Sequence, residues 1–155
     1  MKKAFTFIEM ILVVAILAVL VALGVPRFQG TYQDLQLTNA ARGLAKLLTY
    51  AEERAVIDEK KYRLQVNLAQ RQYWLTVASE EGENQYDRLS GRYGRTVQFP
   101  ETISFSVDKE EIFFYPDGSS DPFLITLKNS EGRELLLRDG KPFGYVRVEE
   151  KRPPS

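Results

Sequence analysis

A stretch of 21 residues near the start of the chain, Phe5 to Val25, contains one charged side chain, Glu9. As an α-helix this stretch would extend about 31 Å at roughly 1.5 Å per residue, enough to cross the hydrocarbon core of a membrane. Lys2 and Lys3 precede it and the next charge is Arg27, so the positive-inside rule places the short N-terminus in the cytoplasm. We therefore expect a single membrane-spanning segment over residues 5–25, with the bulk of the chain outside.

The carboxylate of Glu9 separates this segment from simpler alternatives. A charge costs on the order of 2.5–3.5 kcal/mol at the centre of a membrane and less near its edge. A secretory signal peptide would explain the basic start, but its apolar part is shorter than this one and a small-residue cleavage site should follow it. A plain signal anchor has no reason to keep a carboxylate inside its apolar stretch. We therefore expect Glu9 to have a function and a cationic partner.

The composition excludes many enzyme classes. The 155 residues include no histidine and no cysteine, and 21 basic side chains balance 21 acidic ones. Such a chain cannot build a Ser/His/Asp triad, a cysteine nucleophile, a zinc site of thiolates or imidazoles, or a disulfide. Its zero net charge supplies no overall basic field for nucleic acid. We expect neither an enzyme nor a protein with a cofactor or a metal site.

The first nine residues carry a family resemblance. The sequence MKKA followed by FTFIE and an apolar helix resembles the class III leader of type IV pilins and type II secretion pseudopilins. The resemblance implies that a prepilin peptidase removes residues 1–4 by cutting between Ala4 and Phe5, and then N-methylates Phe5. The family usually has glycine at the position of Ala4, and alanine is the next smallest side chain, so we expect processing to survive. It also implies that Glu9 meets the terminal amine of a neighbouring subunit in a fibre.

The region after the apolar segment predicts a second helical part. Pro26 removes a backbone donor and crowds the preceding turn, so a kink or local unwinding is expected there. Residues 26–58 are predicted to form an amphipathic helix that ends near Ile57, because apolar side chains recur at steps of three and four. The members of this stripe are Leu37, Ala41, Leu44, Leu48, Ala51 and Ala55. We expect the stripe to pack on the protein's own sheet.

From Tyr62 onward the apolar period changes to two, which predicts a β-rich head over residues 59–148. A hairpin is predicted from residues 62–68 and 72–78, followed by a long exposed loop over residues 79–95. Further strands are predicted at 97–100, 103–107, 112–115, 124–128, 135–138 and 143–148, with a turn at 116–118 and a flexible tail at 149–155. The predicted fold class is therefore α+β, with one long helix packed on an antiparallel sheet or pair of sheets.

The C-terminal half resembles a narrower group. The segments FYPDGSS at 114–120, ITL at 125–127 and GYVRV at 144–148 are similar to minor pseudopilin H of type II secretion and to FimT-type minor pilins, as is AEERAVI at 51–57. This resemblance implies a pilin-like fold and a structural subunit of the inner membrane with its head in the periplasm. Its partners would be the prepilin peptidase, other pseudopilins in a pseudopilus and, indirectly, the secretin and assembly platform. A minor pilin of a type IV pilus or of a DNA-uptake machine is the alternative.

Other charged or aromatic groups have simpler interpretations. The oxygen-rich segment 117–121 has only two carboxylates, so we interpret it as a hairpin turn rather than a calcium site. Glu80, Glu81 and Glu83 are interpreted as solvated loop charges, and Trp74 and residues 113–115 as core or sheet-face residues. Two groups of basic residues suggest contact with nucleic acid, but acidic residues in the same loop as the second group argue against it. These groups are Lys60, Lys61 and Arg63, and Arg88, Arg92 and Arg95 with Tyr86 and Tyr93 between them.

Overall fold

The computed structural model describes residues 6–80, 82, 85–139 and 147–151, without the side chains of residues 21–31, 147 and 151. The predicted cleavage pair, Ala4 and Phe5, lies outside the described residues. So does the greater part of the last predicted strand, residues 143–146.

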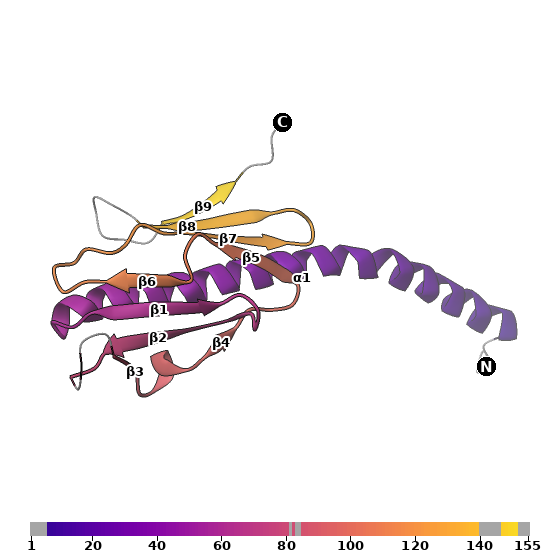
Figure 1. Cartoon of the computed structure of the whole chain (residues 1–155). Coiled ribbons are helices and arrows are strands. Elements are labelled where there is room, and N and C mark those ends of the chain that lie inside the picture. The colour runs from indigo at the N-terminus through magenta and orange to yellow at the C-terminus, as the bar shows by residue number, and fades with distance from the viewer. Residues whose placement is uncertain (1–5, 81, 83–84, 140–146, 152–155) are drawn as a thin grey trace.

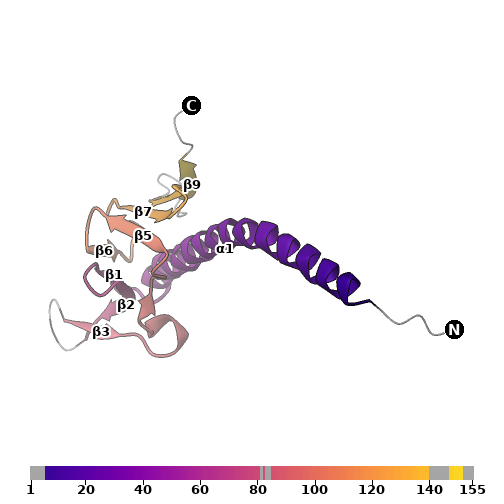
Figure 2. The same cartoon turned by 90° about the vertical axis from the view of Figure 1, so that its right-hand side faces the viewer.

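One helix, α1 (Phe7–Ile57), contains 51 residues and is continuous in its backbone. Its N-terminal half extends away from the rest of the molecule, while its C-terminal half packs against the strands (Figure 1). The helix curves along its length (Figure 2). Its predicted end at Ile57 is confirmed, with the backbone N–H of Asp58 bonded to the carbonyl of Arg54 at 2.9 Å. The kink at Pro26 stays a prediction.

Among the described residues, no helix combines the length and the apolar character needed to cross a membrane.

The strands form two antiparallel sheets. The first has the order β3 (Tyr86–Arg88), β2 (Gln72–Ala78), β1 (Tyr62–Asn67) and β6 (Glu111–Phe114), and β4 (Val97–Gln98) also pairs with β2. The second has the order β5 (Ile103–Val107), β7 (Leu124–Asn129), β8 (Glu134–Arg138) and β9 (Arg147–Lys151). A short 3-10 helix, η1 (Arg92–Gly94), lies between β3 and β4. The α+β fold, with a helix packed on antiparallel sheets, is as predicted.

The core lies between α1 and both sheets. All six residues of the predicted helical stripe are buried, none of them more than 1% exposed. From the first sheet Leu64, Leu75 and Ile112 are fully buried, and from the second Ile125 and Leu137. The alternating burial of β1, in which every second residue is buried, is the period-two pattern that predicted the strand. The apolar face of the helix therefore holds the two sheets together.

Two parts of the head differ from the prediction. The loop expected at residues 79–95 contains β3 and η1, because Thr76, Val77 and Ala78 of β2 provide partners for a third strand. The tail expected to be flexible from residue 149 is wrong for residues 149–151, which belong to β9. This strand pairs with β8 and is held by two ion pairs, Arg133 with Glu150 at 2.8 Å and Arg138 with Glu149 at 2.5 Å.

Candidate functional site

The first turns of α1 expose a continuous apolar surface. Every described residue from 6 to 20 is exposed, and the values for Phe7 and Ile8 are 82% and 76%. Soluble monomers rarely expose a contiguous apolar patch of more than a few hundred Å². Within this chain nothing described covers the segment. This apolar surface is therefore open to contact outside the described part of the chain.

Glu9 is the carboxylate of this apolar surface, and it lies in the first turn of the helix. Thr6 precedes the helix, and its backbone N–H donates a hydrogen bond of 3.4 Å to Oε2 of Glu9. A negative charge is favourable here because the first N–H groups of a helix lack partners within it. The structure thus places the carboxylate at the free end of the helix, directed back towards its N-terminus.

Polar residues further along α1 fix the helix to the second sheet. Asn129 Nδ2 donates a hydrogen bond of 2.8 Å to Oδ1 of Asp34, and Arg133 lies 3.6 Å from the other carboxylate oxygen. The hydroxyl of Thr102 donates to Oε1 of Gln36 at 2.6 Å. Side-chain hydrogen bonds therefore join α1 to the head just beyond its projecting part. The sequence analysis did not identify these residues, because their partners are far away along the chain.

Most of the basic candidates have partners within the head. Lys60 pairs with Glu80 at 2.6 Å. The hydrogen bond between them raises the pKa of Lys60 and lowers the pKa of Glu80. Arg63 pairs with Glu111 at 2.9 Å. Lys61 lies over the rings of Phe113 and Tyr115, and Arg88 lies over the ring of Trp74. These contacts give the cations structural roles on the outer face of the first sheet.

Arg92 and Arg95 differ from the other basic candidates. They line a cleft together with Lys46 of α1, a residue that the sequence analysis did not single out.

The segment 117–121 forms the turn predicted from its sequence. Asp117 Oδ1 accepts a hydrogen bond of 2.9 Å from the backbone N–H of Ser119, and Gly118 has the positive φ of 79° that such turns require. Tyr115 donates its hydroxyl to Oδ1 of Asp121 at 3.2 Å. No group of three or more potential metal ligands occurs in the described part of the chain.

Comparisons of the sequence find no matching family model and no match among curated proteins. Comparisons of the structure do find similar folds. The minor pseudopilin EpsH from the type 2 secretion system of Vibrio cholerae matches in two structures. One has a TM-score of 0.64 at 10% identity, covering 74% of this chain and 97% of the solved chain. The other has a TM-score of 0.61 at 11% identity, covering 80% of this chain and 99% of the solved chain.

The type IV minor pilin FimU of Pseudomonas aeruginosa matches with a TM-score of 0.55 and 16% identity, over 76% of this chain and 98% of that one. The chain therefore has the pilin-like fold, a long helix packed on antiparallel sheets. This likeness confirms at the level of the fold the resemblance to minor pseudopilin H and FimT-type pilins.

Proposed function

We propose that this chain is a structural minor pseudopilin of a type II secretion system. Residues 5–25 anchor it in the inner membrane with the head in the periplasm, and a prepilin peptidase cleaves it between Ala4 and Phe5 and methylates Phe5. It then joins other pseudopilins in a periplasmic pseudopilus, close to the secretin and the assembly platform. One observation carries the proposal: an exposed apolar helix with a single carboxylate, Glu9, projects from a folded head.

The position of Glu9 supports a role in assembly. Removal of residues 1–4 would create a free amine at Phe5, within about one helical turn of the Glu9 carboxylate. In the single chain this carboxylate contacts the backbone of its own first turn through Thr6. When apolar helices pack side by side, an unpaired carboxylate would be costly, and the amine of a neighbouring subunit would neutralise it. The pair would then fix how far one subunit is shifted along the next.

A test of the assembly role compares Glu9→Val with a neighbouring conservative variant, Ile8→Val. The chain contains no cysteine, so one cysteine introduced into its helix and one introduced into the helix of a neighbouring pseudopilin, joined by an added oxidant, report their contact as a disulfide without background from this chain. Glu9→Val should insert into the membrane as the wild type does but form no disulfide cross-links with other subunits. Ile8→Val should do both. Cross-linking of Glu9→Val at the wild-type level would refute the proposal.

The second candidate is a minor pilin of a type IV pilus or of a DNA-uptake machine. The similarity to FimU favours it, although at a lower TM-score, 0.55 against 0.64 for EpsH. Deletion of the gene in the host distinguishes the two. Loss of export of a periplasmic protein with normal pilus-dependent movement and DNA uptake would support the pseudopilin. The opposite pattern would support the pilin.

A further inference from the structure

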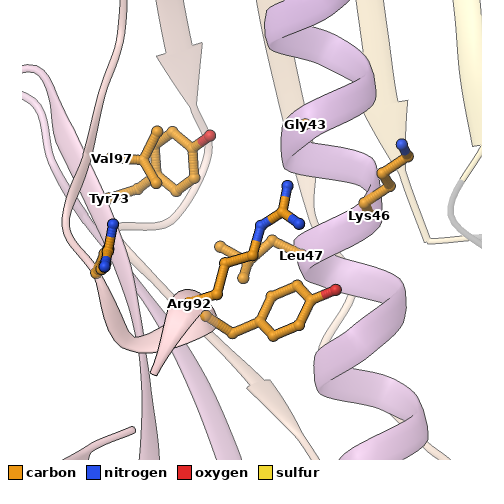
Figure 3. Close-up of a pocket in the computed structure, with 8 residues that line it drawn as sticks. Gly43, Lys46, Leu47, Tyr73, Arg92 and Val97 are labelled. Atoms are coloured by element: carbon orange, nitrogen blue, oxygen red, sulfur yellow. The ribbon is translucent and has the colours of Figure 1, made fainter. Parts of the chain in front are cut away.

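A cleft of about 310 Å³ lies between α1 and the segment that contains η1 and β4. Leu47 and Tyr73, both buried, form apolar parts of its wall. Lys46 lines it from the helix, and Arg92 and Arg95 line it from the opposite segment. In Figure 3 the guanidinium of Arg92 points into the space between η1 and the helix. Three basic residues therefore line one cavity, and no acidic side chain is among its described lining residues.

The segment that carries the two arginines is held in a defined conformation. Tyr93 of η1 stacks on Tyr50 of α1, with ring centroids 3.9 Å apart and planes inclined by 11°. Gly94 is buried, and a Cβ there would lie 1.6 Å from the carbonyl oxygen of Leu89. Gly91 has a φ of 81°, which favours glycine. The arginines therefore project from a segment whose backbone is fixed by packing, so that little conformational freedom is lost when a ligand binds.

The three basic residues of this cleft have no partners in the part of the head that the structure describes. Lys46, Arg92 and Arg95 make no ion pair, hydrogen bond or ring contact with the described residues. By contrast, Arg63 and Arg133 in the same head pair with carboxylates. Arg92 and Arg95 line the same cleft without a counter-charge among the described residues, and like charges repel one another. An anionic ligand would remove this repulsion.

Gly43 is a second, independent observation at the same cleft. It lies within α1, where glycine costs roughly 1 kcal/mol relative to alanine. A Cβ at this position would meet nothing within 4 Å, so no contact inside the molecule requires a glycine. A glycine here leaves room for another chain to approach the helix surface closely. Gly43 lines the cleft beside Lys46 and Leu47.

We propose that this cleft binds an acidic peptide segment of a neighbouring subunit, with aspartate or glutamate side chains on the three cations and an apolar residue against Leu47. This inference rests on the proposed function, because it assigns the acidic segment to another subunit of the fibre. Clusters of arginine recognise carboxylates through paired hydrogen bonds. The apolar wall favours a peptide that alternates acidic and apolar side chains.

Two other anions fit the cleft less well. Lipid headgroups are distant, because Gly43 lies 18 residues beyond Val25, about 27 Å along the helix. A nucleic acid strand needs a continuous basic track, but the neighbouring cations Lys60 and Arg63 are neutralised by Glu80 and Glu111. These two cations therefore cannot extend the charge of the cleft into such a track.

The test is calorimetric titration of the full chain in zwitterionic detergent, which needs neither cleavage nor a fibre. The probes are a six-residue peptide that alternates aspartate and leucine, the same peptide with asparagine in place of aspartate, and a six-nucleotide oligothymidine. The aspartate peptide should bind at least tenfold more tightly than either of the other two. Combining Lys46→Gln, Arg92→Gln and Arg95→Gln should weaken its binding at least tenfold without changing the melting temperature.

Two further variants separate binding from folding. Arg42→Gln removes an exposed cation of the same helix that does not line the cleft, and it should bind as the wild type does. Gly43→Ala should weaken binding at least threefold while it raises the melting temperature. No binding of the aspartate peptide, equal binding of the asparagine peptide, or tighter binding of the oligothymidine would each overturn the proposal. Any of these results together with normal incorporation into the fibre would leave the proposed function standing.

Discussion

Asn129 and Asp34 are 95 positions apart in the sequence and share a hydrogen bond of 2.8 Å between Nδ2 and Oδ1. Asn129 is 3% exposed, and its Oδ1 also accepts the backbone N–H groups of Glu131 at 3.1 Å and Arg133 at 2.9 Å. One side chain therefore shapes the turn between β7 and β8 and attaches it to α1. This junction connects the projecting helix to the head.

Replacing Asn129 with alanine should lower the free energy of unfolding by about 2–3 kcal/mol, because buried backbone and carboxylate groups lose their partners. The matched control is Glu131→Ala, an exposed position in the same turn, which should change it by less than about 0.5 kcal/mol. Thermal unfolding followed by the fluorescence of Trp74, the single tryptophan, measures both. Equal stability of the two variants would contradict this account of the junction.

Arg71 connects the first sheet to the start of the second. Its Nη2 donates to the carbonyl of Pro100 at 2.8 Å and also to that of Ile103, and its guanidinium lies over the ring of Phe105. Arg71→Met should destabilise the head by about 1–3 kcal/mol, since two carbonyl groups lose a charged donor. Lys109→Met, at an exposed position, should have little effect. Similar urea midpoints for the two variants would argue against this role.

Two glycines should respond in opposite directions to the same substitution. Gly94→Ala forces a Cβ against the carbonyl oxygen of Leu89 and should destabilise the protein by about 2 kcal/mol or more. Gly43→Ala places its methyl group in open space within a helix and should stabilise it by up to about 1 kcal/mol. Melting temperatures of the two variants test this. A loss of stability in Gly43→Ala would contradict this prediction, because it would mean that the added methyl group clashes with a neighbouring group.

Glu52 makes the stability depend on pH. Burial, together with the charges of Asp139 and Glu53, raises its pKa from 4.5 to about 7, and among the described residues its Oε2 has no hydrogen-bond partner. Because the fold disfavours the charged form, the contribution of Glu52 to stability is fully present below pH 4.5. It is lost as the pH rises to about 7.

Glu52→Gln should therefore be more stable than the wild type at pH 8, by on the order of 1 kcal/mol for a half-exposed group. The advantage should disappear at pH 4. Unfolding curves of both proteins between pH 4 and pH 8 provide the measurement. Parallel pH profiles would show that Glu52 does not titrate in this range.

The parts of the fold that follow a local period could be predicted from the sequence. The stripe from Leu37 to Ala55 repeats at helical spacing, and burial of all its members gives the helix its place on the sheets. The strand β3 was missed because its three residues show no alternation and pair only through Thr76, Val77 and Ala78. The extension of β9 to Lys151 could not be predicted either, because residues 149–151 are all charged and show no apolar alternation. Two of them pair with Arg133 and Arg138, which lie more than ten positions away in the sequence.

Of the two candidate sites, one could be recognised from the sequence and the other could not. Glu9 could be recognised because a carboxylate within an apolar run is conspicuous in the sequence alone. The cationic cleft could not, because Lys46 and Arg92 are 46 positions apart and come together only through the stacking of Tyr93 on Tyr50. Arg92 and Arg95 were singled out by composition, but only the fold separates them from Arg63, which has a carboxylate partner.

The central claim is that the chain is processed and used as a pilin-like subunit, and its N-terminus tests this most directly. Mass spectrometry of the protein extracted from the membranes of its host should show the loss of residues 1–4 and a methyl group on the new N-terminal Phe5. The same protein from a host without the prepilin peptidase should keep Met1. An intact Met1 in the wild-type host would contradict the account.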